Sequence, residues 1–341
     1  MMRYKLLGKS GLRVSELCLG TMTFGTDWGW GAPIEDCRRM VEQYLEAGGN
    51  FIDTSVNYTN GSSETILGEL LEPLRDKIVL ATKYSLSRDW DDPNAGGNSR
   101  KNMMRSVETS LKRLRTETID LYYLHMWDYL TPLEEVMRGL DDLVRSGKVN
   151  YIAFSDTPAY IVSRAGLLAE LRGWAPVVAL QIPYSLSSRG AERELLPMAR
   201  DLGLTVCPWG LLGGGVLTGK YAGGQDDEPK RMKDPKISER TLRVAATVKE
   251  VAAESGRSPA QVAINWVRQQ TPKADMLPIL GARTPAQLAD NLGALDWTLD
   301  EGQLARLEEA GAIEMGFPHD FLPGNIYIFG NTYDKIDKRR S

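Results

Sequence analysis

Four residues within the first 125 positions have side chains that could do chemistry together: Asp53, Tyr58, Lys83 and His125. A free phenol has a pKa of about 10 and is a weak acid at neutral pH. We expect the Lys83 ammonium to lower the pKa of Tyr58, and Asp53 to keep Lys83 charged and oriented. His125 would donate a hydrogen bond to a substrate oxygen. The set suits reduction of an aldehyde or ketone with Tyr58 as proton donor, and the hydride has to come from a cofactor.

Three of these residues lie in segments that read as buried strands, 50–55, 77–83 and 119–125. Tyr58 follows Asp53 by five residues, so a short loop can return its hydroxyl to the strand ends. Each residue alone has an ordinary structural explanation: an ion pair, a turn tyrosine, a core histidine. Their occurrence in order on consecutive strands favours one shared site, provided that the strands belong to one barrel.

The elements that would position these residues are eight strand–helix units, which predict an α/β protein with a (β/α)8 TIM barrel. In such a barrel the C-terminal strand ends form the active face. No Gly-x-Gly-x-x-Gly follows an early strand, so the usual dinucleotide fingerprint is missing. The predicted strands are 16–20, 50–55, 77–83, 119–125, 149–155, 176–184, 204–209 and 275–281, and the predicted helices are 33–48, 62–72, 101–115, 132–147, 158–172, 190–202, 237–255, 259–270 and 285–294.

Residues 1–341 read as a single barrel domain with additions at both ends and one within it. The segment 4–17 predicts an N-terminal β-hairpin that closes the barrel floor. A long Gly-rich and then charged loop, 211–236, follows the seventh strand. An extra helix over 297–312 is predicted to begin with a capping box of Thr298 and Glu301. The C-terminal tail 313–341 is aromatic-rich, and its packing across the barrel mouth or at an interface stays open.

The composition is that of a soluble globular protein, with 42% hydrophobic and 25% charged residues and a net charge of −4. It gives no reason to expect nucleic-acid or membrane partners, and we expect a cytoplasmic protein. The three cysteines have no metal-type spacing, and the two histidines form no His-x-His motif, so no metal site is expected. A homo-oligomer remains open.

Longer motifs resemble those of the aldo-keto reductases, near the branch that contains channel β-subunits. Asp53-Thr-Ser-Val-Asn-Tyr58, Ala81-Thr-Lys83 and Asp120-Leu-Tyr-Tyr-Leu-His125 are similar to that family's tetrad motifs, and the similarity runs in order over roughly 4–312. The resemblance implies a catalytic tetrad of Asp53, Tyr58, Lys83 and His125, and a barrel that binds NADPH in extended form. The implied activity is that of an alcohol:NADP+ oxidoreductase on a small carbonyl or alcohol substrate.

The resemblance also assigns cofactor positions to the loops at the strand ends. Arg283 and Gln287 would meet the adenosine 2′-phosphate, and Arg283 favours NADPH over NADH. The full implied set is Gly20, Thr21, Met22 and Asp53 at the first two strands; Ser155, Asp156 and Gln181 at the nicotinamide carboxamide; Trp209 flat against the ring; Gly210, Leu211, Gly213, Gly215 and Lys220 along the pyrophosphate; and Gly281, Arg283, Gln287, Asp290 and Asn291 around the adenosine.

Three positions depart from the family pattern and bear on cofactor affinity and preference. Asp156 stands where many members have Asn, so it can accept from the carboxamide NH2 but cannot donate to its oxygen. The sequence Trp209-Gly-Leu-Leu lacks the serine hydroxyl that usually lies near the phosphates. Asp290 is one methylene shorter than the usual Glu.

Aromatic residues near the strand ends predict an apolar substrate cup made of Trp28, Trp30, Tyr84 and Trp127, suited to hydrophobic carbonyls. The leading hypothesis is an NADPH-dependent carbonyl reductase. Its main rival is a cofactor-sensing regulatory subunit with slow turnover, because the family includes channel-associated relatives. A metal-dependent barrel hydrolase or isomerase is a third, weaker alternative.

Overall fold

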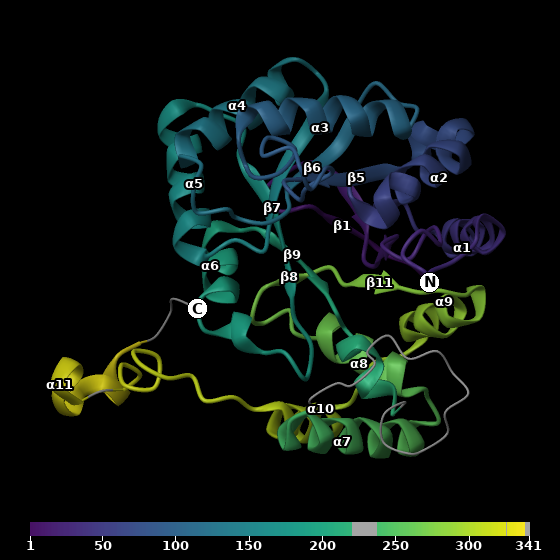
Figure 1. Cartoon of the computed structure of the whole chain (residues 1–341). Coiled ribbons are helices and arrows are strands. Elements are labelled where there is room, and N and C mark those ends of the chain that lie inside the picture. Colours follow the sequence, from purple (N-terminus) through teal and green to yellow (C-terminus); the bar gives the residue numbers. More distant parts are fainter. Residues whose placement is uncertain (220–236, 325, 338–341) are drawn as a thin grey trace.

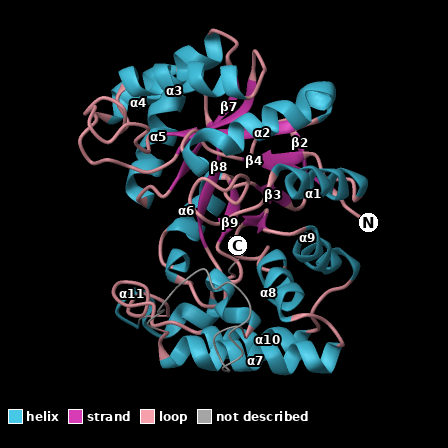
Figure 2. Cartoon of the chain, turned by 45° about the vertical axis from the view of Figure 1, so that its right-hand side comes forward, coloured by secondary structure: helices cyan, strands magenta, loops and turns pink. Residues whose placement is uncertain are grey.

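A curled parallel sheet forms the centre of the molecule, and helices cover its outside (Figures 1 and 2). The computed structural model describes residues 1–219, 237–324 and 326–337. Neighbouring strands pair in the order β10-β9-β8-β7-β6-β5-β4-β3-β11, all parallel, which confirms the predicted (β/α)8 barrel. The strands are β3 Cys18–Gly20, β4 Phe51–Asp53, β5 Val79–Tyr84, β6 Ile119–Leu124, β7 Val149–Ser155, β8 Val177–Pro183, β9 Thr205–Trp209, β10 Asp275–Met276 and β11 Ile279–Gly281.

The predicted eighth strand, 275–281, is divided into two pieces. β10 pairs with β9, whereas β11 pairs with β3 and so joins the two ends of the barrel. Between the pieces, Leu277 donates its N–H to the Val206 carbonyl at 2.8 Å, and the Pro278 carbonyl accepts from the Cys18 N–H at 2.9 Å. Pro278 has no N–H of its own, so the pairing changes partner at this residue.

Most predicted helices are present, with ends that differ by a few residues. The helix predicted over 190–202 is shorter, because Gly190–Glu192 forms a separate 3-10 turn and α6 begins at Leu195. The capping box predicted from Thr298 was wrong: Asp300 caps the last barrel-associated helix, α10, together with Gln303. The helices are α1 Ile34–Glu46, α2 Ser62–Leu71, α3 Arg100–Arg113, α4 Leu133–Arg145, α5 Ala159–Arg172, α6 Leu195–Leu202, α7 Glu239–Ser255, α8 Pro259–Arg268, α9 Pro285–Leu292, α10 Glu301–Gly311 and α11 Ile326–Phe329.

The alternation of side chains along each strand decides which residues enter the barrel. In β6, Leu121 and Tyr123 belong to the cluster inside the barrel, whereas Tyr122 and Leu124 belong to the layer between sheet and helices. Because the period is two, the residue two places beyond an inner core residue also points inward, as His125 does after Tyr123. The same step leads from Phe51 to Asp53, from Ala81 to Lys83, from Ala153 to Ser155, from Ala179 to Gln181 and from Cys207 to Trp209.

The predicted N-terminal hairpin closes the floor of the barrel. Its strands are β1, Tyr4–Leu6, and β2, Arg13–Ser15, which pair antiparallel. Leu7 and Val14 are fully buried within the inner cluster. At Gly8 a Cβ atom would come within 2.1 Å of the Val178 carbonyl oxygen, and its φ is +55°, so only glycine fits this approach.

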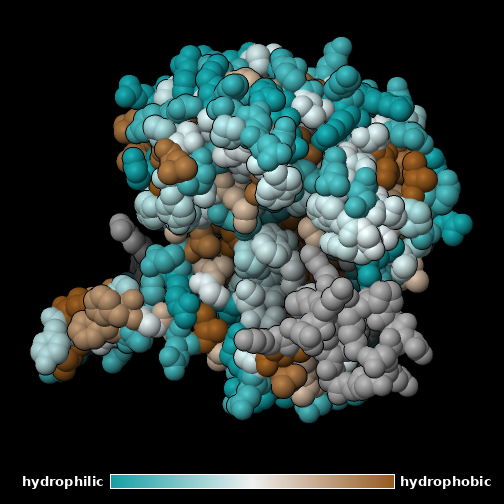
Figure 3. Space-filling model, viewed as in Figure 1, coloured by the Kyte–Doolittle hydropathy of each residue, from teal (hydrophilic) through white to brown (hydrophobic). Residues whose placement is uncertain are grey.

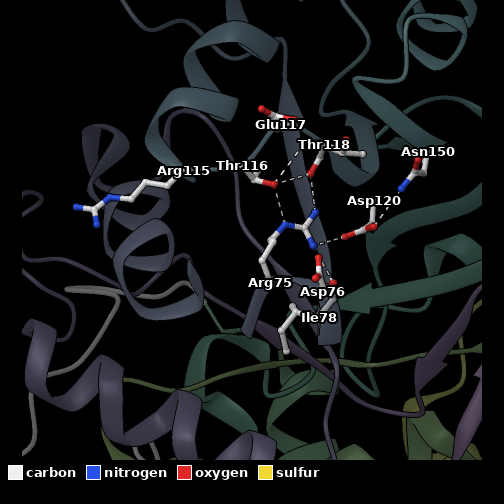
Figure 4. Close-up of a pocket in the computed structure, with 9 residues that line it drawn as sticks. All are labelled: Arg75, Asp76, Ile78, Arg115, Thr116, Glu117, Thr118, Asp120 and Asn150. Carbon is white, nitrogen blue, oxygen red and sulfur yellow. Dashed lines mark hydrogen bonds and ion pairs between the residues drawn. The ribbon is translucent and has the colours of Figure 1, made fainter. Parts of the chain in front are cut away.

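A polar depression at this N-terminal end of the strands is centred on Arg75, which is bonded to the residues around it (Figure 4). The Arg75 guanidinium lies 2.8 Å from Asp120, donates to the Thr116 hydroxyl at 3.0 Å and to the Ile78 carbonyl at 2.9 Å. These contacts tie together the segments that enter β5 and β6. The depression therefore stabilises the floor and offers no unpaired cation to a ligand.

The described part of the C-terminal tail extends away from the barrel and presents apolar side chains (Figures 1 and 3). Its first residues are held by Arg193, which donates to the Met315 carbonyl at 3.0 Å, and by His319, whose Nε2 lies 2.9 Å from Glu194.

None of the described helices has the length and hydrophobicity of a membrane-spanning segment.

Candidate active site

The four residues singled out from the sequence meet at the C-terminal end of the strands. The Lys83 ammonium donates to Asp53 Oδ2 at 2.6 Å and lies 3.1 Å from the Tyr58 hydroxyl oxygen. It also donates to the Thr54 carbonyl at 2.7 Å. The Tyr58 and His125 rings pack edge to face, with centroids 5.8 Å apart. One ammonium thus contacts both the carboxylate and the phenol, as the sequence analysis predicted.

Tyr58 is placed by a tight turn that follows β4. The turn Tyr58–Gly61 contains Thr59 and Asn60 at positive φ, 45° and 54°, and ends with Gly61 at φ 97°. The Thr59 hydroxyl donates to the Phe24 carbonyl at 2.6 Å and accepts from the Ser63 N–H at 3.0 Å. This turn brings the phenol back over the strand ends, and it stays in place because both of its sides are hydrogen bonded.

Lys83 and Asp53 form a buried ion pair with little solvent contact, at 0% and 2% exposure. Burial alone would lower the pKa of Lys83, but Asp53 and Tyr58 more than offset it and raise that pKa above its ordinary value. Burial raises the pKa of Asp53 against the lowering effects of Lys83 and Gln181. Lys83 therefore remains a cation at neutral pH, paired with the Asp53 carboxylate.

The expected lowering of the Tyr58 pKa does not occur in this structure. Burial of the hydroxyl raises the pKa, and this effect outweighs the lowering by the Lys83 ammonium. Asp53 and Asp156 raise it further. Lys83 does lower this pKa, as expected from the sequence, but the cost of removing a phenolate from water is larger. Tyr58 is thus a neutral phenol at physiological pH.

His125 is a neutral imidazole, because burial and the nearby Lys83 hold its pKa well below its ordinary value. Its Nδ1 lies 3.1 Å from the Ser55 hydroxyl oxygen, which also contacts Asn57 Oδ1 at 2.7 Å. Ser55 is buried and orients the ring, a role the sequence analysis missed. The signal was available: Ser55 stands two residues beyond Asp53 in the same short segment.

Next to this cluster, the ends of β7, β8 and β9 carry polar groups suited to an amide and a ring. Gln181 donates from Nε2 to Asp53 Oδ1 at 2.9 Å, which links the two groups of residues. The hydroxyl of Ser155 is buried and has no hydrogen-bond partner among the described residues. Trp209 is 40% exposed at the end of β9, and its indole N–H donates to Asp156 Oδ1 at 3.3 Å. A buried, unsatisfied hydroxyl beside an exposed flat ring fits the carboxamide and the ring of a nicotinamide.

A cavity of about 360 Å3 continues from Trp30 along the loop after β9 to the end of β11. Gly214 and Gly215 line it, and together with Gly213 they have positive φ at the start of the short 3-10 segment Gly213–Thr218. Eight residues predicted to hold the cofactor lie in its wall, namely Gly210, Leu211, Gly215, Gly281, Arg283, Gln287, Asp290 and Asn291. Lys220, also predicted there, lies outside the described residues.

A family model described as the aldo/keto reductase family matches residues 16–312. The chain belongs to the aldo/keto reductase family. A norsolorinic acid reductase of Aspergillus flavus is 36% identical over 93% of this chain and 83% of its own length. Norsolorinic acid reductase B of Dothistroma septosporum is 38% identical over 96% and 86%, and an aryl-alcohol dehydrogenase (NADP+) of Phanerodontia chrysosporium is 36% identical over 96% and 89%. The family predicted from the tetrad motifs is confirmed, and relatives named reductases and dehydrogenases support an oxidoreductase.

Several side chains predicted to hold the cofactor form hydrogen bonds within the protein itself. Asp290 accepts from the Ser258 hydroxyl and from Gln261 Nε2, each at 2.9 Å. Asn291 donates to the Gly281 carbonyl at 3.2 Å. These residues therefore shape the end of the cavity, and Ser258 and Gln261 are wall or support residues that the sequence analysis missed. Nothing in the local sequence distinguishes them from the start of an ordinary helix, because Ser258 is also the N-cap of α8.

Two further predicted cofactor residues also form hydrogen bonds within the protein: Thr21 after the first strand and Gln287 in α9. Thr21 is buried, and its hydroxyl donates to the Asp53 carbonyl at 2.9 Å. Gln287 accepts from the Arg283 N–H at 2.9 Å. Gly20 and Met22 complete the predicted first-strand positions, and Met22 is half-buried beside them.

The residues of the predicted aromatic cup lie only partly where the sequence led us to expect them. Trp28 and Trp30 lie together with ring centroids 5.7 Å apart, and Trp28 donates to Asn60 Oδ1 at 3.2 Å, beside the Tyr58 turn. Trp127 donates its backbone N–H to the Asp156 carbonyl at 3.4 Å. Tyr84 does not fit the role predicted for it. It is fully buried on the outer face of β5 and stacks on Tyr122, with ring centroids 5.4 Å apart.

The alternation along β5 explains the position of Tyr84, since Lys83 points into the barrel and its neighbour must point toward the helices.

Among the described residues, no group of three His, Cys, Asp or Glu side chains is arranged to hold a metal ion.

Proposed function

We propose that this member of the aldo/keto reductase family is an NADPH-dependent oxidoreductase that interconverts aromatic or alicyclic carbonyl compounds and alcohols. The contact of one buried ammonium, Lys83, with both Asp53 and Tyr58 carries the proposal. Such a contact leaves a neutral proton donor at the mouth of the barrel with a fixed cation behind it. The names of the relatives, which refer to aryl alcohols and norsolorinic acid, support the substrate class.

In this proposal Tyr58 donates its proton to the carbonyl oxygen as that oxygen gains negative charge. Lys83 stabilises the phenolate that remains, and Asp53 keeps Lys83 in position through the 2.6 Å contact. The neutral His125 ring orients the carbonyl. NADPH, when bound, supplies the hydride.

The same side chains would hold the cofactor against the barrel. Ser155 and Gln181 would contact the carboxamide, Trp209 the ring, and Arg283 the 2′-phosphate. The unsatisfied Ser155 hydroxyl and the exposed Trp209 ring support the first two assignments. Arg283 lines the cavity end and supports NADPH over NADH, because a guanidinium binds a phosphate through paired hydrogen bonds.

Replacement of Tyr58 by Phe tests the mechanism. Tyr58→Phe should lower carbonyl reduction by at least about a hundredfold, because the proton donor is lost. Its Kd for NADPH, measured by fluorescence titration, should stay within about threefold of wild type, since one hydroxyl is removed. Tyr84→Phe is the matched control, because that hydroxyl lies outside the site, and it should retain turnover. Unchanged turnover in Tyr58→Phe would contradict the proposal.

A panel of aromatic and alicyclic carbonyls and alcohols, run in parallel with NADPH and NADH, tests the substrate class and the cofactor preference. We expect steady-state turnover with a higher kcat/KM for NADPH. A single burst of NADPH oxidation without steady-state turnover on any carbonyl would favour the cofactor-sensing regulatory subunit instead.

A further inference from the structure

Asp156 forms hydrogen bonds with two of the residues proposed to hold the nicotinamide, Gln181 and Trp209. It follows the unsatisfied Ser155 at the end of β7, and its backbone N–H donates to the Gln181 carbonyl at 3.1 Å. Its Oδ1 accepts from the Trp209 indole at 3.3 Å, so the carboxylate lies at the edge of the ring that the nicotinamide would stack against. Many members of the family are expected to have Asn at this position, and Asn carries no charge.

The charges around Asp156 do not cancel. Lys83 contributes one positive charge, and Asp53 neutralises it at 2.6 Å. Among the described residues, the other titratable groups that face this space are Tyr58 and His125, and both are neutral because burial disfavours their charged forms. The Asp156 carboxylate therefore leaves a net negative charge beside the proposed nicotinamide position.

This charge distinguishes the two forms of the cofactor, because the nicotinamide ring is a cation in NADP+ and neutral in NADPH. We infer that Asp156 makes the site favour NADP+ over NADPH, and so shifts the reaction on the protein toward alcohol oxidation. The inference rests on the proposed function, and it adds a determinant of reaction direction to that site. By thermodynamic linkage, the factor by which Asp156 favours binding of NADP+ is also the factor by which it shifts the redox equilibrium of the protein-bound cofactor toward NADP+.

The backbone offers a matched variant that separates charge from shape. Asp156 has φ 38°, a left-handed conformation that Asp and Asn both adopt more readily than other residues. Asn can also accept the Trp209 hydrogen bond through its amide oxygen. Asp156→Asn therefore preserves the conformation and the indole contact, and it removes only the charge.

Isothermal calorimetry of each purified protein with NADP+ and with NADPH tests the inference without turnover. The ratio Kd(NADPH)/Kd(NADP+) should fall about tenfold in Asp156→Asn, the effect expected of one partly screened charge. Asp91→Asn is the charge-matched control, because Asp91 is exposed in the loop after β5, and it should leave the ratio unchanged. A ratio within twofold of wild type in Asp156→Asn would overturn the inference while leaving the proposed function intact. Failure of both nucleotides to bind wild-type protein would overturn the proposed function, and this inference with it.

The pH dependence of the wild-type protein provides a second measurement that needs no variant. Burial raises the pKa of Asp156 to about 6, against the lowering effects of the Trp209 hydrogen bond and of Lys83. The carboxylate is charged above this pH, so the preference for NADP+ should be present at about pH 8 and decline as the pH falls through about 6. The cofactor phosphates titrate in both forms and largely cancel in the ratio. A ratio that stays constant between about pH 8 and pH 5.5 would overturn the inference.

Discussion

Tyr58 and His125 both lie beside the Lys83 ammonium, and each has its protonation state set chiefly by burial. For Tyr58, burial and Lys83 act in opposite directions, and burial has the larger effect. For His125, they act in the same direction and favour the neutral ring. The site therefore starts reduction with a neutral acid, a neutral imidazole and a paired cation.

These protonation states predict a flat pH profile for the chemical step of reduction. The Tyr58 pKa lies above its ordinary value, so the phenol stays protonated, and the pKa of His125 is too low for it to charge. The single-turnover rate of NADPH oxidation should vary less than about twofold between about pH 7 and pH 9. Stopped-flow mixing of the preformed protein–NADPH complex with a carbonyl measures it. A decline through pH 7–8 would mean that His125 or Tyr58 titrates there.

At the scale of elements, the turn that carries Tyr58 depends on α2 and α3. Arg113 of α3 donates to the Val56 carbonyl at 2.7 Å and lies 3.4 Å from Glu64 of α2. Glu64 is fully buried and also accepts from the Thr82 hydroxyl at 2.7 Å. Gly61 has φ +97°, and a Cβ atom there would come within 2.2 Å of the Arg113 guanidinium. Glycine at this position therefore allows both the backbone conformation of the turn and its close contact with Arg113.

Removal of this guanidinium should loosen the turn and destabilise the fold. Arg113→Met leaves the buried Glu64 carboxylate without its cation, which should cost about 3 kcal/mol. The urea unfolding midpoint should fall, together with the single-turnover rate. The double variant Arg113→Met/Glu64→Gln should recover part of the lost stability, because it has no unpaired buried carboxylate.

An exposed pair provides the control for this double-mutant comparison. Arg115 and Glu72 lie 2.9 Å apart with both side chains largely exposed, so Arg115→Met should cost less than about 1 kcal/mol. Equal losses in Arg113→Met and Arg115→Met would show that the buried contact has no special role.

Strand positions were predictable from the sequence because buried parallel strands are continuous apolar runs. The same runs hide which face each residue occupies, so Tyr84 was assigned to the pocket although its neighbour Lys83 already occupied the inner face. The period of two, counted from Lys83, would have excluded it. The capping box was misplaced by two residues because Thr298 and Asp300 both suit an N-cap, and only the helix start at Glu301 decides between them.

At the scale of the whole molecule, eight strand–helix units were enough to predict a closed barrel. How the barrel closes was not predictable, because 275–281 is one apolar run and its change of partner depends on tertiary pairing at Pro278. The position of the tail was also not predictable. Phe317 and Tyr327 are exposed, but nothing in the sequence distinguishes them from aromatic residues that pack against a barrel.

The division of the eighth strand has a consequence for amide hydrogen exchange. β11 holds the barrel ends together through three residue pairs with β3, and Ile279, Leu280 and Gly281 also line the proposed cofactor cavity. Short pairings open more readily than long ones, and a ligand that binds only the closed form adds its binding energy to closure. Amides of Ile279–Gly281 should therefore exchange faster than those of β6 in the free protein and slow by about tenfold or more with saturating NADPH. Mass spectrometry of peptides from β11 and β6 measures this exchange. Equal protection with and without NADPH would show that the pairing of β11 with β3 is already fully closed in the free protein.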